Sequence, residues 1–326
     1  MSGFSRPKIV VSKCIEFCAC RYNGDVIHSQ TVADMTKFAD FLPVCPEVEI
    51  GMGVPRISVR IVDNEGIKKL VAGKTGEDFT EKMNIFSEVF LEKLNRNDID
   101  GFIFKTSSPS CGYRDARVYS AVEGGTSIRK NYSGFFAGKA EEKFDGKIFE
   151  TEGRLENFTI REDFYTKIFL SASFRELKNN MTIKELVDFH SKNKYLLMSY
   201  SSLSLKKMGN IAANRGNKEI MEVFAEYENE LSKALDKKRK TGTNINVLLH
   251  LMGYFSEKLS KEEKNFFLEK LEQYKEMMVP LSVTLSIIEG WAIRFNEEYL
   301  RKQTILNPFP KELIKVTDSG KGREIK

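Results

Sequence analysis

Short apolar runs alternate with amphipathic stretches in the first half of the chain. Residues 8–12 read KIVVS and residues 101–105 read GFIFK, and both runs favour buried strands. Residues 42–45 are a candidate for a further short strand. Residues 31–41 and 78–94 repeat apolar positions at helical spacing. Strands that alternate with helices predict an α/β domain with a mostly parallel sheet.

The character of the chain changes after residue 154. Two short apolar runs before that point, 58–62 and 68–71, flank a turn-rich tetrad and predict a β-hairpin. Beyond it the strand-like alternation disappears, and long helical patterns cover 160–178, 183–213, 217–239, 243–259, 261–278 and 281–302. We therefore predict a Rossmann-like α/β domain over 1–154 and an all-α domain over 155–315. The polar tail, 316–326, is predicted to be disordered.

Composition narrows the class of protein further. The chain has no apolar run long enough to cross a bilayer and no apolar stretch of signal-peptide length near its start, so we expect it to be cytoplasmic. The net charge is +5, and the excess lies entirely in the second half. That distribution is compatible with a nucleic-acid surface, although a solvated face of a helical domain looks similar.

All five cysteines lie in the first third of the chain, at Cys14, Cys18, Cys20, Cys45 and Cys111. An odd number without a secretion signal argues against a disulfide framework. Cys14, Cys45 and Cys111 each come just after a predicted strand, and the carboxyl ends of parallel strands meet at one edge of a sheet. This convergence predicts a metal site, with an iron–sulfur cluster favoured. The alternative is that the thiols simply pack, and Cys18 and Cys20 either supply a fourth ligand or line the loop.

Three motifs resemble those of the bacterial thiouracil desulfidases (DUF523-type domain). SKC at 12–14 leads to CRYNG at 20–24, CPEV at 45–48 precedes Arg56, and SPSCG stands at 108–112. Residues 155–313 resemble a DUF1722-type helical domain that is often fused to desulfidases, as in enzymes that remove sulfur from 4-thiouridine in tRNA. The resemblance implies a [4Fe-4S] cluster held by Cys14, Cys45 and Cys111.

The resemblance also implies roles for individual residues. Glu47, two residues after a cluster ligand, is the candidate proton-transfer group, although it can also cap a helix. Ser108 and Ser110 are candidates for contacts with substrate or cluster sulfur, with turn formation as the alternative. Arg21 and Tyr22 suit stacking on a pyrimidine, and Arg56 suits a phosphate or carbonyl of the substrate. A structural ion pair is the equally weighted alternative for these residues.

Basic residues of the helical domain are candidates for RNA contacts. They are Lys206, Lys207, Arg215, Lys218 and the run Lys237, Lys238, Arg239 and Lys240. Basic residues at a helix end also complement the helix dipole. His190 and Lys194 share a helix face, where they contact RNA or only stabilise the helix.

The leading hypothesis is hydrolytic removal of sulfur from thiolated uracil, preferably 4-thiouridine in tRNA. A second hypothesis is a desulfidase of free thiouracil. A third is a non-enzymatic iron–sulfur protein in which the helical domain mediates interactions.

Overall fold

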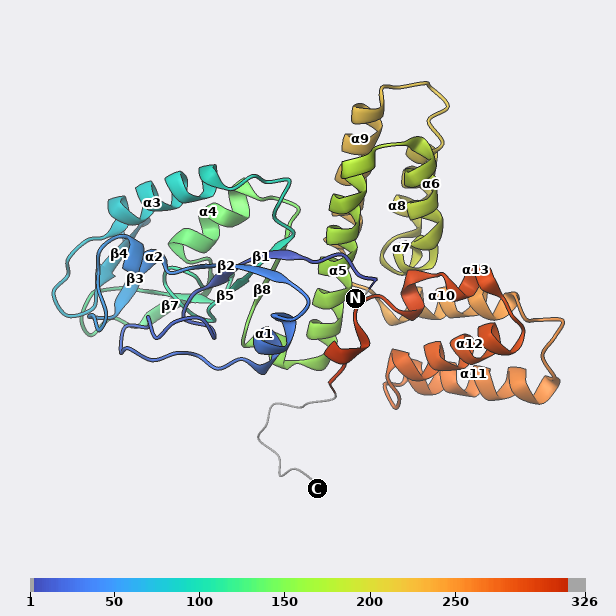
Figure 1. The fold of residues 1–326 in the computed structure, drawn as a ribbon. Coiled ribbons are helices and arrows are strands. Elements are labelled where there is room, and N and C mark those ends of the chain that lie inside the picture. Colours follow the sequence, from blue (N-terminus) through green and yellow to red (C-terminus); the bar gives the residue numbers. More distant parts are fainter. Residues whose placement is uncertain (1–2, 316–326) are drawn as a thin grey trace. The chain divides into compact units, whose positions relative to one another are not determined.

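A computed structural model describes residues 3–315 of the chain (Figure 1). The predicted disordered tail, 316–326, lies outside the described residues. The chain divides into two compact units, of which the first runs to Arg175 and resumes at Phe309, and the second covers Glu176–Pro308. This division falls later than the predicted boundary after residue 154. The reason is that helix α5 (Phe158–Leu177) packs its apolar face, including Ile168, against the sheet of the first unit.

The first unit is built on a four-stranded, all-parallel sheet, which confirms the predicted fold class. Its strands are β1 (Lys8–Ser12), β2 (Asp40–Val44), β5 (Gly101–Phe104) and β8 (Ile148–Thr151), in the order β2-β1-β5-β8. Val10 and Phe102 face a core closed by α3 (Thr80–Lys93) and α4 (Phe135–Lys143), whereas Val11 faces the core closed by α5. Both faces are covered, so the strands read as continuous apolar runs.

A second, mixed sheet follows the order β4-β3-β6-β7. Strands β3 (Val59–Asn64) and β4 (Ile67–Ala72) form the predicted antiparallel hairpin. Strand β6 (Ala116–Tyr119) runs parallel to β3 and antiparallel to β7 (Ser127–Tyr132). The apolar pattern predicts neither β6 nor β7, because these strands carry charged residues at exposed positions.

Helix α1 and the predicted helix 183–213 differ in extent from the sequence prediction. Helix α1 (Gln30–Met35) ends before residue 41, because Asp40 already begins β2. The segment 183–213 is not one helix but three, namely α6 (Ile183–Lys192), α7 (Lys194–Tyr200) and α8 (Ser202–Ala212). The break at Ser201 has a local cause, because its extended backbone (φ −163°) lets its hydroxyl accept a hydrogen bond from Ser204 N and cap α8.

The predicted helix 243–259 already ends at Gly253, and the segment 281–302 holds two helices rather than one, so both predictions were wrong in extent. Five helices follow α8 in the described part of the second unit. They are α9 (Ile220–Leu235), α10 (Thr241–Gly253), α11 (Lys261–Lys275), α12 (Leu281–Arg294) and α13 (Glu298–Arg301). Short 3-10 turns lie at Arg154–Glu156, Lys178–Asn180, Thr304–Leu306 and Lys311–Leu313. Within residues 3–315, no helix combines the length and apolar character needed to cross a bilayer.

A histidine–tyrosine pair links α6 to α9 inside the second unit. The Nδ1 atom of His190 lies 3.0 Å from the hydroxyl of the fully buried Tyr227. Burial, and secondarily the charge of Lys194, lowers the pKa of His190. The pair joins two helices of the helical unit, which agrees with the structural alternative for His190 rather than with an RNA contact.

We expect this histidine to make the helical unit acid-sensitive. Because the folded pKa is lowered, the unfolded chain takes up the proton first, and stability is lost as the pH falls below about 6.5. A single histidine contributes a slope of at most about 1.4 kcal/mol per pH unit. The pH dependence of the free energy of unfolding is measured by urea unfolding between pH 7.5 and 5.5. The fluorescence of Trp291 reports on the helical unit, because Trp291 is the single tryptophan of the sequence and lies in α12.

The substitution His190→Gln should flatten part of that pH dependence. The exposed His250 provides the matched control, and His250→Gln should retain the wild-type slope. Identical slopes in the wild-type chain and His190→Gln would exclude His190 as the group that titrates.

Candidate metal centre

Three cysteines from separate loops lie at the carboxyl edge of the parallel sheet. Cys14 follows β1, Cys45 directly follows β2, and Cys111 lies in the loop after β5. Burial, and secondarily the Cys45 thiol, raises the pKa of Cys14 to about 12. Burial also raises the pKa of Cys111, again with contributions from Cys45 and Cys14. The three thiols thus lie close enough to influence one another, as the positions of the strands predict.

The loop that carries Cys111 is held by its own serines and by the start of α4. The Ser108 hydroxyl oxygen accepts hydrogen bonds from Cys111 N (3.0 Å) and Ser110 N (3.2 Å). The amides of Phe136 and Ala137, in the first turn of α4, donate to the Ser110 carbonyl at 2.9 and 3.1 Å. These contacts agree with the turn-forming alternative for Ser108.

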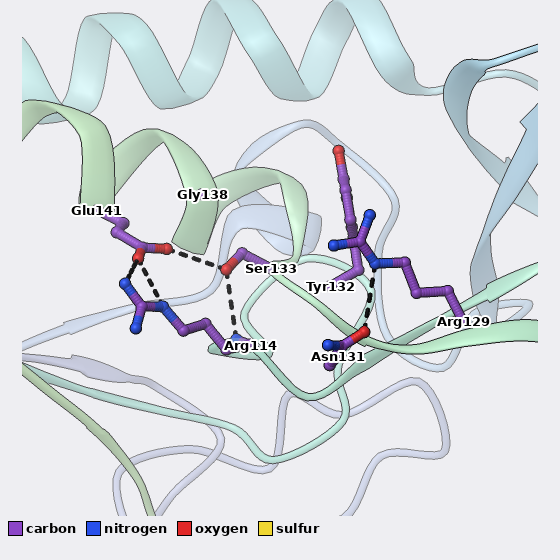
Figure 2. Close-up of a pocket in the computed structure, with 7 residues that line it drawn as sticks. All are labelled: Arg114, Arg129, Asn131, Tyr132, Ser133, Gly138 and Glu141. Carbon is purple, nitrogen blue, oxygen red and sulfur yellow. Dashed lines mark hydrogen bonds and ion pairs between the residues drawn. The ribbon is translucent and has the colours of Figure 1, made fainter.

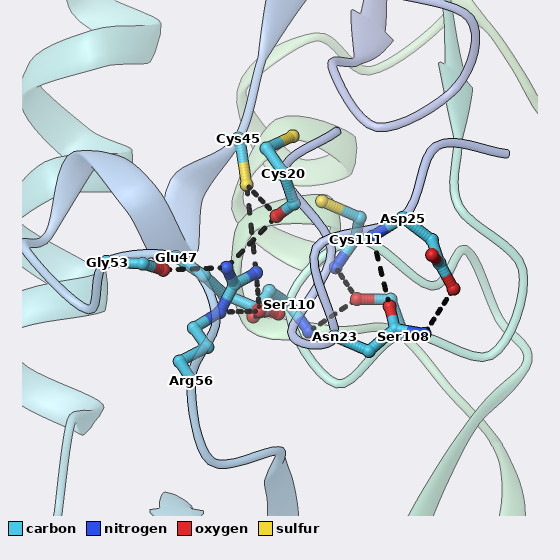
Figure 3. Close-up of polar contacts among 10 residues, drawn as sticks. All are labelled: Cys20, Asn23, Asp25, Cys45, Glu47, Gly53, Arg56, Ser108, Ser110 and Cys111. Carbon is cyan, nitrogen blue, oxygen red and sulfur yellow. Dashed lines mark hydrogen bonds and ion pairs between the residues drawn. The ribbon is translucent and has the colours of Figure 1, made fainter. Parts of the chain in front are cut away.

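A buried ion pair stands beside Cys45 (Figure 3). Glu47 lies in the short helix α2 (Pro46–Glu49), and one of its carboxylate oxygens accepts a hydrogen bond from the Ser110 hydroxyl at 2.8 Å. The other oxygen accepts from Arg56 Nε at 2.9 Å, and the Arg56 and Glu47 side chains are only 5% and 14% exposed. Glu47 therefore joins the loops of two cysteines, Cys45 and Cys111.

The remaining donors of Arg56 are also bound within the protein. Its Nη1 donates to the carbonyls of Cys20 and Gly53, both at 3.0 Å, and its Nη2 lies 3.9 Å from Cys45 Sγ. Burial is the largest single effect and lowers the pKa of Arg56, but the charge and hydrogen bond of Glu47, together with the Cys45 and Cys20 thiols, raise it overall. These contacts are those of a residue that positions Glu47 and the Cys45 loop, rather than of one free to hold a substrate.

Arg21 and Tyr22 lie at the surface of the same region. The Tyr22 side chain is exposed, and its carbonyl accepts a hydrogen bond from Arg56 N at 2.7 Å. The guanidinium carbon of Arg21 lies 5.7 Å from the centroid of the Tyr22 ring, and Arg21 Nη1 lies 3.9 Å from Asp25. An exposed aromatic ring anchored next to Arg56 is available for stacking.

Cys20 is a fourth buried thiol beside the three. Its pKa is raised by burial first and then by Cys45 and Cys14, and its carbonyl accepts a hydrogen bond from Cys45 Sγ at 3.8 Å. Cys18 is only partly buried. Cys20 therefore lies close enough to Cys45 and Cys14 to be the fourth ligand that the sequence analysis considered.

Sequence reasoning missed one charged group near Cys14. Glu152, which follows β8, accepts hydrogen bonds from Thr106 N and Oγ1 at 2.7 and 2.9 Å and pairs with Lys105 Nζ at 3.2 Å. Lys105 lowers the pKa of Cys14, and Glu152 raises it. Glu152 could have been found only from its position directly after strand β8, and the apolar pattern does not predict that strand.

Residues 9–152 match the family model of 2-thiouracil desulfurase. The first unit thus contains a domain of the 2-thiouracil desulfurase type. Residues 194–310 match a second family model, described as a protein of unknown function (DUF1722). The chain thus joins a desulfurase domain to a DUF1722 domain, as the sequence motifs indicate.

Individual relatives are distant. The uncharacterized protein YbbK of Bacillus subtilis (strain 168) is 28% identical over 125 residues, 37% of this chain and 82% of YbbK. The uncharacterized protein YbgA of Escherichia coli (strain K12) is 22% identical over 156 residues, 47% of this chain and 92% of YbgA. Among solved structures, the [4Fe-4S]-dependent thiouracil desulfidase TudS is 25% identical, with a TM-score of 0.38, and the match covers 48% of this chain and 98% of TudS.

The donor set at this edge of the sheet consists of cysteine thiols. Between residues 3 and 315, no three His, Cys, Asp or Glu side chains are grouped closely enough to hold one metal ion. A four-iron cluster is bound through different irons, so its ligand sulfurs lie farther apart than the ligands of one ion. Thiolates are soft ligands that suit iron, and Arg56 and Lys105 supply positive charge beside them.

The basic candidates of the DUF1722 domain differ in their environments. Lys206, Arg215 and Lys238 are exposed, and Lys207 lies 3.9 Å from Glu230. Lys218 is bound by ion pairs to two glutamates of α9. In the run 237–240, Lys237 Nζ donates to Ser201 Oγ at 3.0 Å, Arg239 lies over the Tyr200 ring, and Lys240 precedes α10 as its N-cap. Part of this basic run therefore fastens the α9–α10 connection to the α7–α8 junction.

We expect Gly134→Ala to displace the Cys111 loop of the desulfurase domain. A Cβ at Gly134 would lie 2.6 Å from the carbonyl carbon and oxygen of Ser110. Because these are backbone atoms, relieving the clash requires a shift of the loop. The expected results are a loss of about 1–3 kcal/mol of stability and faster alkylation of Cys111 in the metal-free protein. Thermal unfolding and mass spectrometry measure these two effects.

Gly138→Ala, one turn further along α4, is the matched control. Its added Cβ would meet nothing closer than Ser133 Cβ at 3.6 Å, an ordinary contact. Equal alkylation of Cys111 in the two variants would contradict a supporting role for Gly134.

Proposed function

We propose that the protein hydrolyses the carbon–sulfur bond of thiolated uracil at a [4Fe-4S] cluster, and that its substrate is 4-thiouridine in tRNA. The match of residues 9–152 to the 2-thiouracil desulfurase family supports thiouracil as the substrate class. The observation that carries the proposal is the meeting of Cys14, Cys45 and Cys111 beside the Glu47–Ser110 hydrogen bond. Hydrolysis exchanges the thiocarbonyl sulfur for oxygen from water and releases hydrogen sulfide, without net oxidation or reduction.

Cys14, Cys45 and Cys111 are the proposed ligands, with one iron left without a protein ligand. Such an iron supplies a Lewis acid with affinity for the sulfur of a thiocarbonyl. Cys45 and Cys111 are buried and Cys14 is mostly so, which makes their deprotonated forms costly unless positive charge compensates them. Arg56 lies beside Cys45 Sγ and Lys105 lowers the pKa of Cys14, but each cation is paired with a carboxylate, Glu47 or Glu152, so the iron of the proposed cluster would have to supply most of that positive charge.

Glu47 is the proposed proton acceptor for the attacking water. Its carboxylate is held from two sides, by the Ser110 hydroxyl and by the Arg56 guanidinium, so its orientation is fixed. A group that stays in place contributes most to proton transfer, because little reorganisation is needed in the transition state. Ser110 is buried and orients Glu47, whereas Ser108 forms the turn that presents Cys111.

The nucleobase is proposed to stack on Tyr22. The ring is exposed, its backbone is anchored to Arg56, and Arg21 lies beside it. Stacking of a base on an aromatic side chain contributes about 1–3 kcal/mol. The helical unit is proposed to bind tRNA phosphates through its exposed basic residues, among them Lys206 and Lys238.

The proposal is tested by anaerobic reconstitution with iron and sulfide, followed by incubation with thiolated tRNA and with free thiouracil. We expect Cys111→Ala to lose iron and activity together. We expect Glu47→Gln to keep its iron and to lose about 10²–10⁴ in turnover, since it removes only the proton acceptor. Metal analysis and loss of the thiocarbonyl absorbance measure the two quantities.

Glu49→Gln, the same charge change on the same short helix, is the control and should remain active. A wild-type protein that binds a cluster but turns over neither tRNA nor free base would favour the non-enzymatic alternative. Full activity in Glu47→Gln would exclude the proposed proton acceptor.

A separate prediction concerns the choice between tRNA and free base. The double variant Lys206→Ala with Lys238→Ala should weaken tRNA binding and lower the salt slope of binding by up to about two, because each lysine accounts for roughly one phosphate contact. Turnover of free thiouracil should not change. Binding of tRNA at several salt concentrations and turnover of both substrates are the measurements.

Lys261→Ala with Lys264→Ala removes the same charge from α11 of the same unit and is the control. If both double variants affect tRNA equally, net charge rather than a specific surface governs binding. If neither affects it, the helical unit does not bind tRNA through these lysines.

A further inference from the structure

Strands β6 and β7 carry basic side chains that no carboxylate of residues 3–315 neutralises. Arg117, Arg129 and Lys130 are exposed, and none of them is within ion-pair distance of an acidic side chain in the part of the chain that the structure describes. Neighbouring cations of the same sheet behave differently, because Lys68 and Lys69 on β4 are paired with Asp63 and Asp78. Positive charge left unpaired on one pair of strands attracts an anion.

A cavity opens beside this pair of strands (Figure 2). It has a volume of about 620 Å³, and its lining residues are Arg114, Arg129, Asn131, Tyr132, Ser133, Gly138 and Glu141. The Glu141 carboxylate is already engaged, because it accepts hydrogen bonds from Arg114 and from the Ser133 hydroxyl, the latter at 3.0 Å. Arg129 Nε donates to Asn131 Oδ1 at 3.2 Å, and its guanidinium carbon lies 5.6 Å from the Tyr132 ring centroid. The guanidinium of Arg129 is thus oriented in the cavity without a counter-ion.

The wall of the cavity is continuous with the support of the Cys111 loop. Arg114 N donates to the Ser133 hydroxyl at 3.3 Å, and Gly134 N donates to the Gly112 carbonyl at 2.7 Å. Gly134 also packs directly on Ser110, as the short approach of its would-be Cβ shows. The residues that line the cavity therefore adjoin the residues that hold one of the proposed cluster ligands.

We propose that this cavity is a phosphate-binding subsite, with Arg129 as its principal donor. A guanidinium binds a phosphate with two parallel hydrogen bonds, which is why arginine is favoured in such sites. The assignment of this phosphate to the nucleotide that carries the thiolated base rests on the proposed function. The group is either the 5′-phosphate of that nucleotide or a neighbouring phosphate of an RNA backbone.

The test measures binding of sulfur-free probes to the full-length, cluster-loaded protein. The probes are uridine, uridine 5′-monophosphate and an unmodified RNA hairpin, each compared between the wild-type chain and Arg129→Ala. We expect Arg129→Ala to weaken the monophosphate or the hairpin by about tenfold and to leave uridine unaffected, because a charged hydrogen bond contributes on this scale. Arg129→Lys should recover only part of the loss, since it keeps the charge but not the fork.

Lys74→Ala is the control, because Lys74 is an exposed cation in the connection between β4 and α3 of the same unit. A loss confined to the hairpin identifies a backbone phosphate, and a loss with the monophosphate identifies the phosphate of the substrate nucleotide. Unchanged affinity for both probes in Arg129→Ala, an equal loss in Lys74→Ala, or no binding of either probe to the wild-type chain overturns the proposal.

The binding test is independent of desulfidation. If the wild-type protein turns over no thiolated substrate but binds the probes through Arg129, the proposed function fails and the phosphate subsite stands. If it turns over free thiouracil while Arg129 makes no difference to either probe, the function stands and the subsite is rejected.

Discussion

The burial of several thiols at one edge of a parallel sheet is the constraint on which the rest of the desulfurase unit depends. Cys45 and Cys111 are buried and Cys14 is mostly so, and they come from loops that follow three neighbouring strands. Each thiol makes ionisation of its neighbours harder. Metal binding requires deprotonated ligands, so the free-energy cost of ionising these thiols must be offset by nearby positive charge. Binding of the proposed cluster would therefore be coupled to folding at this edge.

The protein itself supplies part of that charge and links it to the proposed chemistry. Arg56 contacts Cys45 Sγ and Glu47 with the same guanidinium, and Glu47 in turn accepts a hydrogen bond from Ser110, next to Cys111. One ion pair thus fixes two cysteine loops and one carboxylate. The start of α4 holds the Cys111 loop from the other side through the Ser110 carbonyl. These contacts hold the carboxylate of Glu47, the proposed proton acceptor, in one orientation before substrate binds.

The two units have different kinds of surface. Basic residues give the helical unit its excess of charge, but several are used internally, as Lys237 is at Ser201 and Lys218 is at α9. The desulfurase unit is balanced in charge over its sequence, yet its β6–β7 strands keep Arg117, Arg129 and Lys130 unpaired. Charge counted along a chain is thus a poor guide to the charge that a ligand meets, because internal pairing removes some of it.

The sequence by itself determined the parallel core, the hairpin around residues 63–66 and the convergence of the cysteines. These depend on apolar runs such as 8–12 and 101–105 and on turn residues, whose preferences are local. The tertiary structure alone decided the break at Ser201, the short strands β6 to β8, and the contacts of Arg56, Glu152 and Ser108. Those features depend on which groups from distant segments come within hydrogen-bond reach. A side chain such as Arg56 has the same local sequence whether it binds a substrate or a neighbouring carboxylate, and only the packing of the loops distinguishes the two.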